Sequence, residues 1–99
     1  MRSTGSLSKA GAKAVHPNGS SFVASSGARQ SGCLSGPSSA NFDLYLQRLR
    51  GSTWITMASS ARSTSSERVV FAGPASRYRW VVVDRKGSGR YTLTTALTP

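Results

Sequence analysis

Hydrophobic and polar residues alternate along residues 41–49 in the pattern of a β-strand with one buried face. Phe42, Leu44 and Leu46 occupy one set of alternate positions, and polar or amphipathic residues such as Tyr45 occupy the other. A Gly-Pro pair precedes the segment and a Gly-Ser pair follows it. A period of two between turn residues predicts a half-buried strand.

From residue 29 onward, similar short segments rich in β-branched and aromatic residues alternate with turns. The expected strands are Arg29–Ser35, Phe42–Leu49, Thr53–Ser59, Glu67–Ala72, Arg77–Asp84 and Arg90–Ala96. We expect a polar loop over Ala61–Ser66 and a hairpin-type turn over Lys86–Gly89. No window shows a capped helical period of apolar residues. The pattern predicts an all-β fold, a small antiparallel β-sandwich over residues 29–97, with jelly-roll-like architecture.

Residues 1–28 are rich in Ser, Gly, Ala and basic residues and contain few large apolar side chains. Such a segment buries little surface to offset its ordering entropy, so we expect a flexible tail. Phe22 and Val23 leave open whether a short edge strand forms there. His16 lies next to Pro17 in this polar segment, and we expect its side chain to be solvated.

Length and charge limit the possible functions. The chain has 99 residues, enough for one domain with a modest core. Thirteen Lys and Arg against three Asp and Glu give a net charge of +10, which favours acidic partners. Residues 1–19 contain no apolar run of the kind a signal peptide needs, and no stretch approaches membrane-spanning length. We expect no signal peptide within this sequence and no membrane span.

Cys33 is the single cysteine. It has no partner within the chain for a disulfide, and it lies on an expected strand. A lone thiol there is expected to behave as a small buried hydrophobic side chain, and pairing between chains stays open.

Several short motifs occur in a fixed order along residues 31–96. In the first half they are Gly36-Pro37, Asn41–Arg48, Gly51–Trp54 and Ala58–Ser60; in the second they are Ser66-Glu67, Gly73–Ala75, Tyr78–Val82 and Gly87–Leu93. This series resembles the bacterial pre-peptidase C-terminal domain. The resemblance implies a jelly-roll-like β-sandwich at the C-terminal side of a secreted bacterial protease or other hydrolase. Such a domain is not itself a catalyst; it supports secretion or folding of its parent, or holds insoluble substrate.

Some members of that family bind calcium through acidic loop residues, and this sequence departs from their pattern. Members usually carry an acidic residue where Asn41 stands, so only Asp43 remains of the pair. Calcium prefers several oxygen ligands that include carboxylates. With three acidic residues in the chain, we expect no cofactor, and Asp43 is the one candidate calcium ligand.

The residues by themselves also argue against catalysis. General acid–base chemistry needs a tunable histidine or paired carboxylates in one pocket. The only histidine lies in the expected tail, while Asp43, Glu67 and Asp84 lie on separate strands or strand ends. We expect that the chain alone is not an enzyme.

Exposed aromatic side chains are the candidate binding residues, because flat rings stack on sugars and peptides. Trp54, Tyr45 and Tyr78 are the candidates, whereas Trp80 lies in the most apolar strand and is expected in the core. The partner would be a parent catalytic domain or its macromolecular substrate. We expect the domain to be monomeric.

Two alternatives stay open. A basic β-surface could bind a polyanion such as nucleic acid or acidic polysaccharide. However, Arg77 and Arg79 project to the face opposite Tyr78 and Trp80, and basic residues are scattered along the chain, so nucleic acid is not the expected partner. The domain could also stabilise its parent without binding any ligand.

Overall fold

The computed structural model describes residues 1–61 and 66–98, and every regular element in these ranges is a β-strand. The strands are β1 (Arg2–Leu7), β2 (Lys13–His16), β3 (Phe22–Ala24), β4 (Arg29–Ser35), β5 (Asn41–Arg50), β6 (Thr53–Ser60), β7 (Ser66–Ala72), β8 (Ser76–Lys86) and β9 (Gly89–Thr98). The prediction of an all-β antiparallel sandwich is confirmed.

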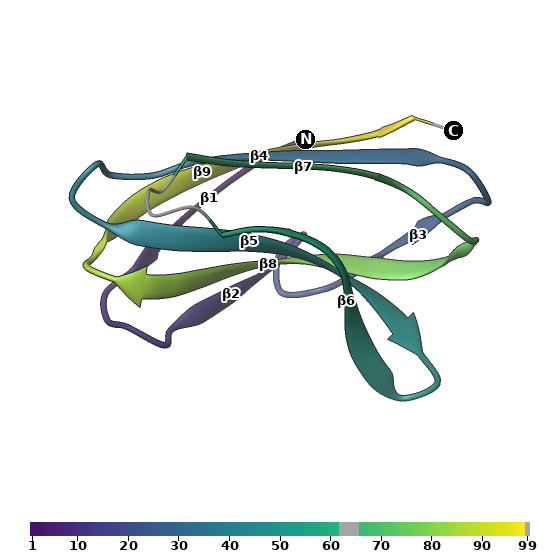
Figure 1. The fold of residues 1–99 in the computed structure, drawn as a ribbon, viewed down its shortest axis with the longest axis horizontal. Helices are drawn as coiled ribbons and strands as arrows, with labels where there is room; N and C mark the ends of the chain where they lie inside the picture. The colour runs from purple at the N-terminus through teal and green to yellow at the C-terminus, as the bar shows by residue number, and fades with distance from the viewer. Residues whose placement is uncertain (62–65, 99) are drawn as a thin grey trace.

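The strands form two antiparallel sheets that pack face to face (Figure 1). The first sheet has the order β1-β9-β4-β7, and the second has the order β2-β8-β5-β6. β3 also pairs with β8, next to β2 along the same strand. Only β2–β3 and β5–β6 are consecutive strands within one sheet; every other connection crosses between the layers.

The core lies between the two sheets and is built from alternate positions of the long strands. Phe42, Leu44 and Leu46 on β5 are fully buried, and so are Val82 on β8 and Leu93 on β9. Burial of large apolar side chains is the main stabilising contribution in such a fold. The alternation seen in the sequence of β5 is therefore the alternation between core and outer face.

One close approach between the layers requires a glycine. Gly32 on β4 lies against the Trp80 indole of β8, and a Cβ atom at this position would lie 2.8 Å from the ring carbon Cζ3. That distance is well inside van der Waals contact. The absence of a side chain at Gly32 thus makes room for Trp80, which is buried as predicted.

Residues 1–28 do not form the predicted flexible tail. β1 pairs with β9 along its whole length, and β2 and β3 pair with β8. Leu7 and Ala24 are buried in the core. The segment is ordered because neighbouring strands supply the hydrogen-bonding edge and the apolar contacts that its own composition lacks. The open question about Phe22 and Val23 is settled by β3, which contains both.

Two other details differ from the sequence prediction. The Gly-rich segment after Lys86 is not a hairpin, because β8 and β9 lie in different sheets and the chain turns a corner between them. Gly87 and Gly89 there have positive φ values of 84° and 149°, a region that glycine adopts freely. The loop predicted over Ala61–Ser66 lies largely outside the described residues, and Ser66 begins β7.

Candidate functional site

The outer face of the second sheet carries two arginine–aromatic pairs. Residues Asp43, Tyr45 and Gln47 of β5 point to this face because they alternate with the buried Phe42, Leu44 and Leu46. From β8, Arg79 and Arg85 reach over the same face, and Trp54 of β6 joins them. We call these six outward residues, Asp43, Tyr45, Gln47, Trp54, Arg79 and Arg85, the arginine–aromatic face.

The first pair joins Arg79 and Trp54. The guanidinium carbon of Arg79 lies 4.4 Å from the centroid of the Trp54 ring, within the range of a cation–π interaction. Arg79 Nε also donates a hydrogen bond of 2.8 Å to Gln47 Oε1, and Gln47 Nε2 donates to Thr56 Oγ1 at 3.4 Å. The indole and the guanidinium are therefore held by contacts from three adjacent strands.

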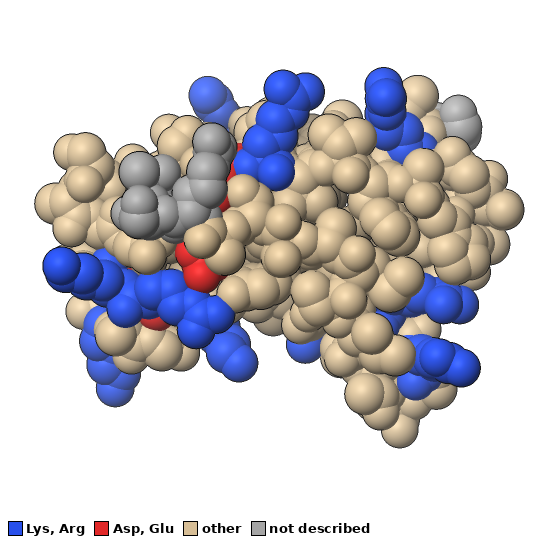
Figure 2. Space-filling model, viewed as in Figure 1, with Lys and Arg blue, Asp and Glu red and all other residues tan. Residues whose placement is uncertain are grey.

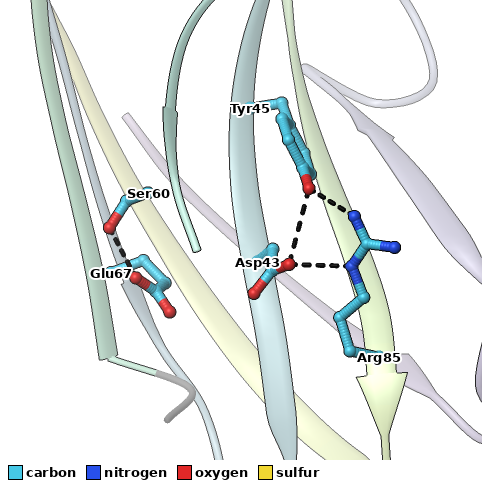
Figure 3. Close-up of polar contacts among 5 residues, drawn as sticks. All are labelled: Asp43, Tyr45, Ser60, Glu67 and Arg85. Carbon is cyan, nitrogen blue, oxygen red and sulfur yellow. Dashed lines mark hydrogen bonds and ion pairs between the residues drawn. The ribbon is translucent and has the colours of Figure 1, made fainter. Parts of the chain in front are cut away.

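A β-bulge places the second pair. The pairing of β5 and β8 shifts between Asn41 and Phe42, so that Arg85 is the extra residue of β8, and bulges commonly redirect a side chain in this way. Arg85 Nε donates to Asp43 Oδ2 at 2.8 Å, and Arg85 Nη2 donates to the Tyr45 hydroxyl oxygen (Figure 3). The Tyr45 hydroxyl in turn lies 3.4 Å from Asp43 Oδ2.

Electrostatics favour this arrangement of charges. The hydrogen bond to Asp43 is the largest cause of a raised pKa for Arg85, and the Tyr45 hydroxyl adds to it. The Asp43 side chain is only 5% exposed, whereas Arg85 is 54% exposed. Asp43 thus acts as a buried anchor that orients an accessible guanidinium.

Small apolar side chains lie beneath the arginine–aromatic face. Val81 and Val83 of β8 alternate with core residues, so they point outward, yet they are 4% and 7% exposed. Long neighbouring side chains therefore cover them. The result is an apolar floor beneath two half-buried rings and hydrogen-bond donors, a combination suited to contact with another macromolecule.

The structure brings together two of the three predicted aromatic residues. Trp54 and Tyr45 are both half-buried on the arginine–aromatic face. Tyr78 is not a surface residue: it is fully buried, its ring packs against Phe22 and Phe71, and its hydroxyl donates to the Pro74 carbonyl at 2.7 Å. The prediction of an exposed Tyr78 is wrong because Tyr78 lies on the core-facing side of β8, as Trp80 does, and is covered there by rings from β3 and β7.

The carboxylate of Asp43 does not fit a calcium site. One of its oxygens is bonded to Arg85 and its side chain is almost completely buried, whereas calcium takes six to eight oxygen ligands. Within residues 1–61 and 66–98, no group of three or more His, Cys, Asp or Glu side chains could hold a metal ion.

His16 is buried, in contrast to the solvated side chain expected from the sequence. Its Nε2 atom lies 2.6 Å from the Tyr91 hydroxyl, across the space between the two sheets. Burial lowers the pKa of His16 and raises the pKa of Tyr91. Both groups are therefore held neutral, in a structural contact between β2 and β9.

His16 also lines a small recess at one side of the sandwich. Its lining is mainly apolar and includes Phe22, Trp80 and Leu97, and its volume is about 190 Å³. The His16 Nδ1 atom has no hydrogen-bond partner among the described residues. None of the predicted binding residues Trp54, Tyr45 and Tyr78 is part of the lining of this recess.

Cys33 is exposed rather than buried. It lies on β4 between Arg68 and Thr94 in the register of the first sheet, and alternation directs it outward because Leu34 is buried. The prediction of a buried thiol is wrong for this reason.

A further polar contact connects the two layers. Ser60 at the end of β6 donates a hydrogen bond to Glu67 Oε1 on β7 (Figure 3). The Arg68 amide lies 3.4 Å from Ser60 Oγ. Glu67 is 2% exposed. This contact joins β6 of the second sheet to β7 of the first, and it stabilises the packing of the two sheets.

The two arginine–aromatic pairs were not predicted from the sequence, because each joins residues of different strands. Alternation indicated that Arg79 and Tyr45 point outward. Which ring each arginine reaches depends on the order of strands in the sheet and on the bulge at Arg85. The spacing of residues along the sequence indicates neither the order of the strands nor the bulge.

Comparisons with known proteins place the fold in the class of small β-sandwich domains. No family model matches the sequence. The structure is similar to the pre-peptidase C-terminal domain of a collagenase from Bacillus anthracis, with a TM-score of 0.74 and 15% identity over 97% of this chain and 88% of that one.

Two other solved structures share the fold. One is PliG, a periplasmic inhibitor of g-type lysozyme from Aeromonas hydrophila, with a TM-score of 0.70, 16% identity, and coverage of 99% of this chain and 85% of that one. The other is the mitogen of Yersinia pseudotuberculosis, with a TM-score of 0.70, 12% identity, and coverage of 97% and 83%. At these identities the similarity concerns the fold, which serves different roles in different proteins.

The residues that the structure describes contain no helix with the length and apolar character needed to cross a membrane.

Proposed function

We propose that this chain is a non-catalytic accessory domain of a secreted bacterial peptidase or other hydrolase. It contacts a macromolecule, either the parent catalytic domain or its substrate, through the arginine–aromatic face. The observation that carries the proposal is that Trp54 and Tyr45 are each held against an arginine on one outer sheet face. The fold shared with the collagenase domain supports it.

Pre-ordering of these side chains favours binding. Ordering a long side chain on association costs free energy, so groups that are already fixed lose less. Arg79 is held by Gln47, and Arg85 is held by Asp43. Trp, Tyr and Arg are also the residue types that dominate binding energies at protein interfaces.

The described side chains support a binding role over a catalytic one. His16 is buried against Tyr91, and Asp43 is paired with Arg85. His16 lines a recess whose lining contains no carboxylate, so it is not combined there with Asp43 into the acid–base pair that such chemistry uses. The proposed contact needs no metal ion. We further propose that the domain acts outside the cytoplasm and as a monomer.

The test is a retention assay on insoluble protein, on insoluble polysaccharide and on the separately produced catalytic domain of the parent. We expect Trp54→Ala and Tyr45→Ala to weaken binding to one of these by about tenfold each, the effect of losing an interface residue worth roughly 1.4 kcal/mol. Val70→Ala is the matched control, because Val70 is 47% exposed on the other sheet. Binding unchanged in both aromatic variants would overturn the proposed contact face.

A further inference from the structure

The outer edge of β6 is an unpaired strand edge. β6 is at the end of the second sheet and pairs with β5 on one side. On its other side, no strand in residues 1–61 or 66–98 is paired with it. The β5–β6 hairpin also extends beyond the two packed layers, so that much of this edge faces outward (Figure 1).

The sequence of β6 lacks the charged residues and proline that usually protect an edge, although a β-bulge at Met57 interrupts its pairing with β5. Natural edge strands carry charged residues or proline, or are very short. The other edges follow this rule: β1 carries Arg2, β7 carries Glu67 and Arg68, β2 carries Lys13, and β3 has three residues. β6 has eight residues, Thr-Trp-Ile-Thr-Met-Ala-Ser-Ser, with neither charge nor proline.

Its side chains favour pairing with a further strand. Threonine, tryptophan and isoleucine all have high β-propensity, and Ile55 is 37% exposed. An exposed edge of this composition either aggregates or is covered by a partner strand. The high net charge of the chain opposes aggregation, which leaves pairing with a partner.

The charge around the edge indicates the chemistry of that partner. Arg48 and Arg50 on β5 are register partners of Ile55 and Thr53, and the Arg79 guanidinium lies over Trp54. Figure 2 shows Lys and Arg side chains on the projecting part of the molecule at the lower right. Positive groups therefore lie on both faces of this strand pair.

A second copy of the chain fits this edge poorly. Pairing of β6 with β6 of another molecule would bring the arginines of the two hairpins together, and each molecule carries a net charge of +10. Like charges placed across a strand pair are destabilising. The same arginines would attract a strand that carries carboxylates.

We propose that the free edge of β6 pairs with an extended, acidic segment of a partner protein. Main-chain hydrogen bonds along β6 supply the affinity, and Arg48, Arg50 and Arg79 select for Asp or Glu in the segment. This proposal rests on the proposed function, because both require that the domain contacts a partner. It uses the main-chain edge of β6 and shares Arg79 and Trp54 with the arginine–aromatic face, but it does not involve Tyr45.

The first experiment compares three synthetic peptides on the full chain by calorimetry. One alternates valine or threonine with glutamate over eight residues, the second has lysine in place of glutamate, and the third is the glutamate peptide with alternate backbone amides methylated. We expect the glutamate peptide to bind at least about tenfold more tightly than either of the others. The lysine peptide tests charge, and the methylated peptide tests main-chain pairing.

The second experiment locates the peptide and tests the arginines. Amide hydrogen exchange should slow at alternate residues of β6 when the glutamate peptide is added, and stay unchanged along β1 and β7. Arg48→Gln should weaken binding of the glutamate peptide several-fold, while the matched variant Arg68→Gln on β7 should not.

Three results would overturn the inference: no binding of the glutamate peptide, equal binding of its methylated form, or protection at another edge. A dimer that protects β6 without peptide would assign the edge to a second copy instead. The outcomes are separable from the face test through Tyr45→Ala, because Tyr45 lies on β5, away from the β6 edge, and its loss should weaken retention without weakening peptide binding. Loss of one interaction with the other intact identifies which proposal fails.

Discussion

Several polar side chains are buried within the sandwich, and the contact between His16 and Tyr91 is the most informative of them. Nε2 of His16 is satisfied by the Tyr91 hydroxyl, whereas Nδ1 has no partner among the described residues. A buried imidazole of this kind resists protonation, because the charged form loses its hydration without gaining a counter-ion. Its effect on stability is therefore tied to pH.

We predict that the free energy of unfolding falls as the pH drops below 6.5. The unfolded chain takes up a proton at His16 near its ordinary pKa of 6.5, while burial lowers the pKa in the folded state. Between these two values the unfolded state binds more protons, so stability rises with pH in this window and is fully present above it.

Urea unfolding measured at about pH 7.5 and about pH 5 checks this prediction. His16→Gln removes the titrating group, so its loss of stability between these two pH values should be smaller than that of the parent. The same loss in both proteins would show that His16 does not contribute.

At the same scale, the candidate site was only partly predictable. Alternation along β5 predicted that Tyr45 lies opposite the core positions, either on the outer face or on a second packed face. Alternation along β8 put Tyr78 on the same face as Trp80, the residue expected in the core. It did not indicate the ring contacts of Tyr78 with Phe22 and Phe71. Those contacts depend on β3 and β7 lying near β8, which is a property of the sandwich rather than of the local sequence.

Among the elements, β1 shows most clearly where local composition misleads. Its residues are mostly small and polar, and the composition indicated a tail. The strand is nevertheless ordered by pairing with β9, and Leu7 at its end is 6% exposed in the core. The six strands predicted from residue 29 onward carry their own apolar alternation, which is why the sequence was sufficient to locate them.

Leu7→Ala is expected to destabilise the domain by about 2–4 kcal/mol, the range for removing a buried leucine side chain. Thr4→Ala is the control on the same strand, because Thr4 is exposed, and it should change stability by no more than about 0.5 kcal/mol. Chemical denaturation of both variants provides the measurement. A Leu7 variant as stable as the parent would mean that β1 is not part of the cooperative fold.

For the whole molecule, the distribution of charge argues against a dedicated polyanion site. Arg2 and Arg68 lie on the first sheet, and Arg79 and Arg85 reach over the second. The molecule measures 25 and 21 Å along its two shorter axes, more than the Debye length of about 8 Å at physiological salt. Arginines on opposite faces therefore act separately.

We predict that the domain elutes from heparin at low salt. The slope of log affinity against log salt for single-stranded DNA should stay below about 3 in magnitude, since about 0.7 of the slope comes from each phosphate contact. A slope of about 5 or more would reveal a continuous basic surface and favour the polyanion alternative.

The close packing of Gly32 against Trp80 has a spectroscopic consequence. The chain contains two tryptophans, and the structure places one in the interior and the other on the outer face. The buried indole of Trp80 reports on loss of the packed layers, whereas Trp54 reports on events at the surface where a partner would bind. A Trp54→Phe variant retains only the interior signal of Trp80, so comparing its fluorescence with that of the parent separates unfolding from events at the surface.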